Sequence, residues 1–377
     1  MHSRGFFAGI LLLSTVFFLT ALSTGCSLNG GAGDFISAKK YDDATTAGVN
    51  DIIDRQMKDG GIPGALVGVW EEGYETLLIA KGLADVAVAR PAQTADRFRI
   101  ASNTKMFTAM ALLMLADEKK ITLDDKVSLY LPEIPHAGLV TIRQLANHTS
   151  GYYDYTEEPA FIAACTAANL LRSWKPAEMI AFINSRPLRF TPGTQYKYSN
   201  TNYTLMGMII EKVGGTSWEN FITQKIITPL ALKDTSCPAG PYIPGNHLKG
   251  YNLENSTPVE IVVDPSFGWA AGGMISTLDD MKKWLDSLAA GSLISPKMYA
   301  EQRSALVTDP ESTGLQYGFG LMVIRTRFIG HTGVIPGYNS GAFISSDGKK
   351  AVIVVFNDEE GFYGASTAFK IINFLFF

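Results

Sequence analysis

The sequence predicts an α+β fold, with one antiparallel β-sheet built from N- and C-terminal segments and flanked by helices. Strand-like apolar runs occur near residues 64–85 and return from about 317 to 356, and a mostly helical insertion separates them. The chain has 377 residues, of which 46% are hydrophobic and 18% charged. That composition is typical of a globular protein with a sizeable core.

The N-terminal residues read as an export signal followed by a tether. Arg4 precedes an apolar run that ends near Leu22, so we expect residues 1–25 to be a signal peptide. The stretch "LSTGC" resembles a lipobox that would lipidate Cys26, although a plain signal peptide with a chance cysteine remains open. Residues 26–43 are rich in Gly, Ser and Asp and predict a flexible tether. We therefore expect export to the periplasm or cell surface, with membrane anchoring through the lipid.

Residues 44–377 are predicted to form the folded domain. Its α/β part covers about 44–117 and 251–377, and its helical part covers about 118–250. The local patterns predict a helix over 44–59, a hairpin over 64–85, a helix over 102–117, a helix that ends at Gly214 and Gly215, a helix with Thr277 as its N-cap, strands in "YGFGLMVIRT", "RFIGHTG", "NSGAFISS" and "KKAVIVVFN", and a final helix.

Charge and cysteine content exclude several functions. The formal net charge is -4 without a block of like charge, so nucleic acid is not an expected partner. No cluster of Cys and His has zinc-ligand spacing, so no metal is expected. Cys165 and Cys237 could form a disulfide in an exported protein, but their spacing leaves this open. The oligomeric state is also left open, because composition does not indicate it.

Ser102 and Lys105 form the first candidate for chemistry. On a helix, residues three apart lie on one face, so a lysine amine can reach a serine hydroxyl. The chain contains three Ser-x-x-Lys patterns, but only "SNTK" opens a helix. The following "MFTAMALLML" is apolar nearly all round, which predicts a buried helix and a desolvated lysine of lowered pKa. The alternative is a helix-capping serine with a lysine that reaches the surface.

Two later motifs add polar groups. Tyr198 and Asn200 follow a Pro-Gly turn, where a phenol could relay a proton and an amide could bind a substrate carbonyl. The alternative is a polar loop in which Asn200 caps the next helix. His331, Thr332 and Gly333 end an apolar strand, where Gly333 would let a ligand's backbone approach. The alternative is an ordinary strand end with an exposed histidine.

Together, these motifs resemble those of the penicillin-recognising serine hydrolases. The branch is the one that holds class C β-lactamases, D-alanyl-D-alanine carboxypeptidases, esterases and D-aminopeptidases. The stretches "LDDKVSLYLPEIP", "TIRQLANHTSGY", "WAAGGMISTLDDM" and "YGFGL" carry the same resemblance. It extends from about residue 48 to the C-terminus and implies a β-lactamase/transpeptidase-like fold.

The resemblance also implies an acyl-enzyme mechanism. Ser102 would be the nucleophile, and Lys105 and Tyr198 would share the general-base and proton-relay work. Which of the two takes the serine proton stays open. The backbone N–H groups of Ser102 and Val334 would form the oxyanion hole. No metal or organic cofactor is implied.

The remaining site residues would bind the substrate. Asn200 would orient the substrate amide, and His331 and Thr332 would face the substrate carboxylate or the leaving group. Arg325 and Arg327 are further candidates for binding a terminal carboxylate. The third motif has His where lactamases have Lys, and histidine is often neutral at pH 7.

The expected function is therefore that of a secreted or lipid-anchored serine hydrolase. The leading expectation is a D-alanyl-D-alanine carboxypeptidase-like penicillin-binding protein that acts on peptidoglycan peptides. An esterase or a class C-type β-lactamase of the same fold is the alternative, so the substrate would be a small molecule or a peptide. A non-catalytic envelope binding protein is the alternative from another class, because a fold does not guarantee activity.

Overall fold

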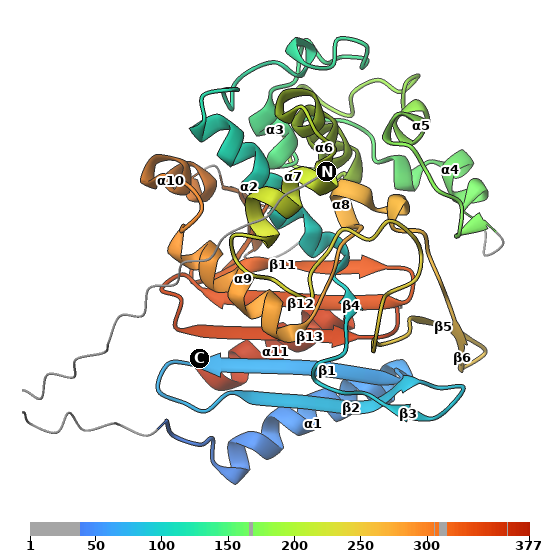
Figure 1. Cartoon of the computed structure of the whole chain (residues 1–377), viewed down its shortest axis with the longest axis vertical. Coiled ribbons are helices and arrows are strands. Elements are labelled where there is room, and N and C mark those ends of the chain that lie inside the picture. Colours follow the sequence, from blue (N-terminus) through green and yellow to red (C-terminus); the bar gives the residue numbers. More distant parts are fainter. Residues whose placement is uncertain (1–37, 166–168, 305, 309–314, 360) are drawn as a thin grey trace, which may run out of the picture. The chain divides into compact units, whose positions relative to one another are not determined.

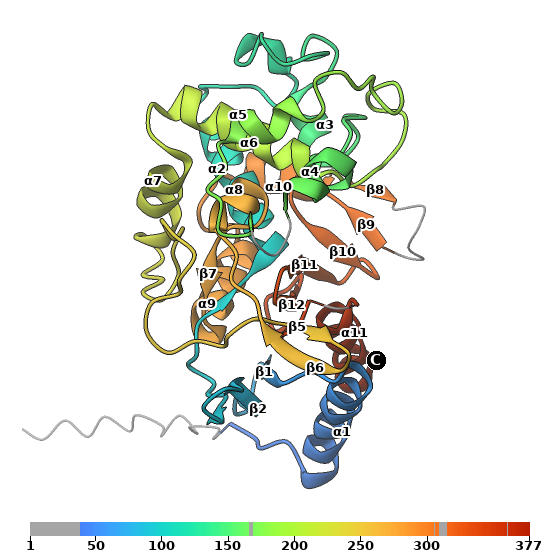
Figure 2. The ribbon, with the colours of Figure 1, turned by 90° about the vertical axis from the view of Figure 1, so that its right-hand side faces the viewer.

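The computed structural model describes residues 38–165, 169–304, 306–308, 315–359 and 361–377. Within these residues, nine strands form one antiparallel sheet in the order β3-β2-β1-β13-β12-β11-β10-β9-β8 (Figure 1, with β8 to β10 in Figure 2). The strands of this sheet are β1 Gly64–Glu71, β2 Leu77–Asp85, β3 Arg90–Pro91, β8 Val307–Thr308, β9 Leu315–Tyr317, β10 Met322–Ile324, β11 Phe328–Ile335, β12 Tyr338–Ser345 and β13 Lys350–Phe356. The short strands β4 Phe98–Arg99 and β7 Ile275–Ser276 pair with each other, as do β5 Tyr251–Glu254 and β6 Thr257–Glu260.

The sheet joins the two ends of the domain. Strand β1 pairs with β13, so that Leu66 lies opposite Val355 although the two residues are far apart in sequence. This pairing confirms the α+β class and the prediction that N- and C-terminal segments share one antiparallel sheet.

Helices cover both faces of the sheet, which explains the continuous apolar runs of its central strands. Leu66 belongs to the core that includes the helices beside the Ser102 segment, whereas Val67 packs into a second core with the first and last helices. Figure 2 shows α9 on one side of the sheet and α1 and α11 on the other. The helices are α1 Asp43–Gly60, α2 Thr104–Asp117, α3 Ile142–Ala146, α4 Pro159–Ala164, α5 Pro176–Ala181, α6 Asn200–Gly214, α7 Trp218–Ile222, α8 Trp269–Gly272, α9 Leu278–Ala290, α10 Pro296–Ser304 and α11 Tyr363–Phe376.

Several helix ends follow the predicted capping residues. The Thr277 side chain accepts a bond from the backbone N of Asp280 and so caps α9. Gly215 ends α6 in the left-handed conformation, at φ 68°, which glycine adopts without steric cost. These predictions are confirmed because the caps are local, and local sequence determines them.

The structure differs from the sequence prediction at two places near the site. "YGFGLMVIRT" is two strands, β9 and β10, because a turn intervenes in which Gly320 has a φ of 73°. Ser102 lies in a short 3-10 helix, η1 (Ala101–Asn103), and the regular helix α2 begins only at Thr104.

The segment between α2 and β5 supplies α3 to α7, together with the 3-10 helices η2 Val127–Leu129 and η3 Tyr155–Glu157 and the π-helical turn η5 Thr223–Ile227. A further 3-10 helix, η6 Pro265–Phe267, precedes α8. Helix α2, the buried helix that follows Ser102, packs against α6 and α8, which both come later in the sequence. In the part of the chain that the structure describes, no helix is long and apolar enough to cross a membrane. The predicted signal peptide and Cys26 lie outside the described residues.

Candidate active site

Ser102 is held on a strained turn that packs against the sheet. The preceding Ala101 is fully buried and has a φ of 50°, a left-handed conformation that costs energy for any residue with a Cβ. Asn103 secures the turn, because its Nδ2 donates to Ile100 O at 3.0 Å and to Ser340 Oγ at 3.0 Å. The backbone and β12 therefore determine where the Ser102 hydroxyl points.

Gly333 lets this turn lie directly on β11. A Cβ at Gly333 would come within 2.6 Å of Ile100 O and 2.9 Å of the Ala101 Cβ. The segment that carries Ser102 thus fills the space that a Gly333 side chain would take, so this packing requires the glycine, which corrects the expectation that the space serves a ligand. The same contact brings Ser102 next to the strand that carries Val334, the two residues whose backbone N–H groups are predicted to form an oxyanion hole.

Lys105 is buried, and its side-chain amine has three hydrogen-bond partners. Its Nζ lies 3.0 Å from Ser102 Oγ, 2.8 Å from Asn200 Oδ1 and 2.7 Å from Ala271 O. The side chain has no exposed surface. Desolvation lowers the pKa of Lys105 to about 7, and the charge of Asp154 opposes that shift. The alternative of a lysine that reaches the surface is therefore wrong.

Tyr198 approaches Ser102 from the other side. Its hydroxyl donates to Ser102 Oγ at 3.0 Å, and Lys105 Nζ lies 4.9 Å from the centre of its ring. Burial raises the pKa of the Tyr198 phenol well above its usual value, so the phenol keeps its proton near neutral pH. The structure thus brings the three predicted catalytic residues together around one serine oxygen.

His148 supports the Tyr198 ring. The imidazole lies 4.3 Å from that ring, centroid to centroid, and its Nδ1 accepts from the backbone N of Ser199 at 3.2 Å. Nε2 must then carry the ring proton. Burial lowers the pKa of His148 well below its ordinary value, which keeps the ring neutral. This histidine lies within the stretch "TIRQLANHTSGY", where no residue pattern indicated its role.

The side chain of Asn200 forms its hydrogen bonds with other groups of the protein. It begins α6, and the residue at the N-cap position is Ser199, so the capping alternative is wrong. Its Nδ2 donates to Asp154 Oδ2 at 3.0 Å and to Thr156 Oγ1 at 3.3 Å, which uses both amide hydrogens. The expectation that this amide donates to a substrate carbonyl is corrected, because protein groups take both of its hydrogens, and Oδ1 faces Lys105. Sequence reasoning missed Asp154, which no motif marks.

His331 lies inside the protein. It has no exposed surface, its Nε2 is 2.8 Å from the Tyr317 hydroxyl, and its Nδ1 is close to the carbonyl of Thr332. Desolvation lowers the pKa of His331 to about 3, so the ring is neutral. Both the exposed-histidine alternative and a direct contact with the substrate carboxylate are therefore corrected. Thr332 is half-buried in the middle of β11, so it remains the polar side chain of this motif that can reach a ligand.

Comparison with known proteins agrees with this geometry. A family model described as Beta-lactamase matches residues 49–374. The chain belongs to the beta-lactamase family. The Streptomyces sp. D-stereospecific amidohydrolase is 32% identical, with a TM-score of 0.78 over 88% of this chain and 98% of that chain. The Ochrobactrum anthropi SV3 D-amino acid amidase is 28% identical, with a TM-score of 0.75 over 88% and 97% of the two chains.

Two curated relatives of this protein are longer than the chain. Protein flp of Staphylococcus aureus is 28% identical over 320 residues, which are 82% of this chain and 62% of the relative. A D-aminopeptidase of Cereibacter sphaeroides is 28% identical over 313 residues, which are 81% of this chain and 59% of the relative. The chain thus spans about 60% of the length of these relatives.

Several other predicted groups of this family member lie away from Ser102. Arg325 and Arg327 flank the β10–β11 turn, where their guanidinium groups lie 5.0 and 5.7 Å from the ring of Phe377. They are thus not placed to bind a carboxylate beside the serine. Cys165 and Cys237 are free thiols in the structure. Within the described residues, no group of His, Cys, Asp and Glu could hold a metal ion.

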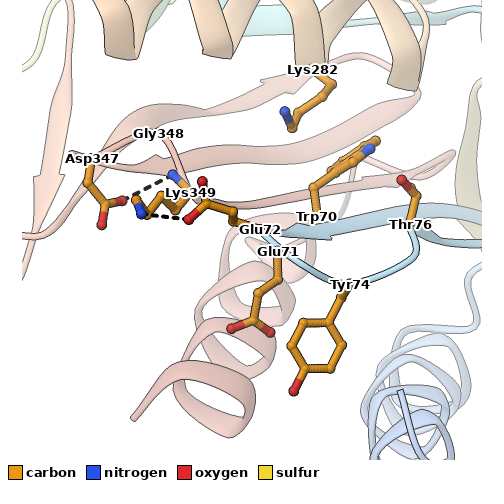
Figure 3. Close-up of a pocket in the computed structure, with 9 residues that line it drawn as sticks. All are labelled: Trp70, Glu71, Glu72, Tyr74, Thr76, Lys282, Asp347, Gly348 and Lys349. Carbon is orange, nitrogen blue, oxygen red and sulfur yellow. Dashed lines mark hydrogen bonds and ion pairs between the residues drawn. The ribbon is translucent and has the colours of Figure 1, made fainter. Parts of the chain in front are cut away.

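A pocket of about 360 Å³ is lined by none of these catalytic candidates, and Figure 3 draws the residues that line it. It lies between the β1–β2 turn, the β12–β13 turn and α9. An ion pair of 2.5 Å between Lys349 and Glu72 crosses its edge. Its lining residues are Trp70, Glu71, Glu72, Tyr74, Thr76, Lys282, Asp347, Gly348 and Lys349, and the set includes none of the residues around Ser102.

Proposed function

We propose that the protein is a serine hydrolase that cleaves an amide bond beside a D-amino acid through an acyl-enzyme on Ser102. The observation that carries the proposal is the buried Lys105 amine, 3.0 Å from Ser102 Oγ and with its pKa lowered to about 7. The preference for a D-amino acid amide is supported by the names of the structural neighbours, a D-stereospecific amidohydrolase and a D-amino acid amidase.

The proposed mechanism gives Lys105 and Tyr198 different tasks. Neutral Lys105 takes the Ser102 proton as Oγ attacks the amide carbon and forms the tetrahedral intermediate. The relay falls to Tyr198, because burial raises the pKa of its phenol and favours the protonated form. Its hydroxyl relays the proton from Lys105 to the leaving nitrogen. Water then attacks the ester of the acyl-enzyme and gives a proton to Lys105. Lys105 passes that proton to Ser102 Oγ as the carboxylic acid product leaves.

The third motif favours an amide over a substrate with a free terminal carboxylate. Three cationic candidates were available from the sequence, and His331 is neutral and buried while Arg325 and Arg327 lie against Phe377. A D-amino acid amide has no carboxylate to pair with them. The D-aminopeptidase among the curated relatives supports the same substrate class.

A D-alanyl-D-alanine carboxypeptidase is the second candidate function. A penicillin-binding protein homologue from Pyrococcus abyssi, 26% identical with a TM-score of 0.75, supports it. Export and lipid anchoring at Cys26 also remain part of the proposal. Loss of the membrane-bound fraction in a Cys26→Ala variant would support the anchor, and unchanged fractionation would refute it.

Steady-state hydrolysis of D- and L-phenylalanine amide tests the leading proposal. We expect the D-enantiomer to be preferred by about tenfold or more, with kcat/KM lowered by about 10⁴-fold or more in Ser102→Ala. Faster cleavage of an N-acylated D-Ala-D-Ala peptide would favour the carboxypeptidase, and rapid turnover of nitrocefin the β-lactamase. Turnover of p-nitrophenyl esters alone would favour the esterase. Activity that persists in Ser102→Ala would overturn the mechanism.

A further inference from the structure

Asp154 is a buried carboxylate that contacts the catalytic network without touching Ser102. Only 4% of its surface is exposed. Oδ1 accepts from the backbone N of Thr156 at 3.0 Å and from the Thr156 hydroxyl at 2.8 Å. Oδ2 accepts from the backbone N of Asn200 at 2.8 Å and from its side-chain Nδ2 at 3.0 Å. Four donors therefore converge on its two oxygens.

These contacts determine which way the Asn200 amide faces. Burial raises the pKa of Asp154, but both of its oxygens accept hydrogen bonds from two donors, so the NH₂ end of Asn200 turns toward it. The carbonyl end, Oδ1, is thereby left facing Lys105 Nζ at 2.8 Å. With the opposite orientation, two oxygens would meet at Asp154 and the amide would donate toward Lys105.

The orientation of that amide decides where the Lys105 lone pair points. A neutral amine has two N–H bonds and one lone pair. The carbonyl oxygens of Ala271 and Asn200 accept the two hydrogens, at 2.7 and 2.8 Å. The lone pair is then left for the third neighbour, the Ser102 hydroxyl at 3.0 Å. A flipped Asn200 would donate to the lone pair and compete with the serine for it.

From this geometry we propose that Asp154 is a positioning residue, which holds the Asn200 amide so that the Lys105 lone pair faces Ser102. The inference rests on the proposed function only in taking Ser102 as the nucleophile. It deepens that function by adding a group that acts at one remove, much as a carboxylate orients the histidine of a serine protease triad.

Asp154→Asn is the sharpest test, because it replaces one acceptor oxygen with an NH₂ group and preserves the shape of the side chain. Each Asp154 oxygen accepts a backbone N–H, from Asn200 or from Thr156, so the new NH₂ group opposes one of these donors and the amide of Asn200 is no longer held in one orientation. We expect kcat/KM and the rate of Ser102 labelling by a fluorophosphonate to fall about 10- to 100-fold, with most of the turnover loss in kcat. In the labelling step, Ser102 Oγ bonds to phosphorus, fluoride leaves, and Lys105 takes the proton.

The pH profile separates positioning from a merely structural role. Asp154 is the negative group whose charge raises the pKa of Lys105. Its removal should move the acid limb of the labelling rate to lower pH, because Lys105 then loses its proton more easily. The other titratable groups near Lys105 are neutral near pH 7 and are unchanged by the substitution: His148, His331, Tyr198 and Tyr203.

Asp264→Asn is the matched control. Asp264 also caps a 3-10 helix, is 7% exposed, and accepts from the backbone N and hydroxyl of Ser266, but it does not contact Asn200. We expect this control to lose stability as Asp154→Asn does, without a shift of the acid limb. The double variant Asp154→Asn with Asn200→Asp returns an oxygen to Lys105. It should recover labelling at alkaline pH, since the new charge raises the Lys105 pKa.

The outcomes distinguish this inference from the proposed function. Labelling of the wild type without cleavage of D-phenylalanine amide refutes the substrate and leaves the inference to be decided by the labelling rates. A folded Asp154→Asn variant with an unchanged rate and acid limb overturns it, as does a wild type that is not labelled. If Asp154→Asn does not fold, Thr156→Val decides, because it removes the acceptor for the second Asn200 amide hydrogen. A severalfold loss of labelling then supports the inference, and no loss refutes it.

Discussion

Two Ser-x-x-Lys segments of the same spacing lie in opposite environments. Lys105 is buried among α2, α6 and α8, and its pKa is lowered to about 7. Lys349 is exposed in the β12–β13 turn, where its ion pair with Glu72 raises its pKa (Figure 3). One lysine is prepared to accept a proton near neutral pH and the other to keep it. The comparison shows that desolvation makes the base, and spacing alone does not.

Removing the two serines should give the largest contrast. Ser102→Ala eliminates the nucleophile, so we expect kcat/KM to fall by about 10⁴- to 10⁶-fold. Ser346→Ala should leave it unchanged, because Ser346 belongs to the β12–β13 turn and makes no contact with Ser102 or Lys105 that would prepare it for attack. Intact mass after incubation with the fluorophosphonate checks both variants. An adduct on Ser102→Ala would place the nucleophile elsewhere.

Removing the two lysines should give a smaller contrast. Lys105→Met preserves the length of the side chain but cannot take a proton, so a loss of about 10²- to 10⁴-fold in kcat is expected. Lys349→Met should retain wild-type kcat, since it loses only an exposed ion pair. Initial rates of amide hydrolysis measure both, with circular dichroism as the control for folding. Equal losses in the two variants would contradict the comparison.

The pH dependence should carry the signature of Lys105 alone. The base works only when neutral, so kcat/KM should rise about tenfold per pH unit below pH 7 and level off above it. The acid limb should be the same in Lys349→Met, whose missing group stays protonated throughout that range because its pKa is raised. An acid limb near pH 10 would mean that Lys105 is not desolvated as the structure has it.

Two glycines offer the finest contrast. Gly333→Ala would press a Cβ against Ile100 O at 2.6 Å and displace the Ser102 turn, at a cost of about 1–3 kcal/mol in unfolding free energy and with reduced activity. Gly348→Ala meets its nearest atom only at 3.7 Å, but its φ of 76° should cost about 1–2 kcal/mol. Urea denaturation should therefore show similar losses of unfolding free energy in the two variants. Measurement of kcat should show a loss of activity only for Gly333→Ala.

The sequence predicted most of what is local or carried by a motif. The α9 cap at Thr277, the left-handed end of α6 at Gly215 and the hairpin of β1 and β2 follow from neighbouring residues. The meeting of Ser102, Lys105 and Tyr198 followed from the family resemblance, and the structure brings these residues into hydrogen-bond contact.

The errors share one cause, which is that partners from distant segments decide what a polar side chain does. His331 reads as a strand-end ligand, yet Tyr317 and the surrounding core hold it neutral and buried. Asn200 reads as a substrate donor, yet Asp154, a residue 46 positions away, takes its amide hydrogens. No periodicity or motif encodes these pairings.

The sequence by itself determined the α+β class and the order of the motifs, because apolar periodicity and cap residues act over a few positions. It also narrowed the nucleophile to Ser102, the only Ser-x-x-Lys serine ahead of an apolar helix. Only the tertiary structure decided that the Lys105 amine is desolvated and that its lone pair is directed at Ser102. The groups responsible are Asn200 and Ala271, which follow Lys105 by 95 and 166 residues in the sequence. Both the desolvation of Lys105 and the direction of its hydrogen bonds depend on where folding brings these two residues.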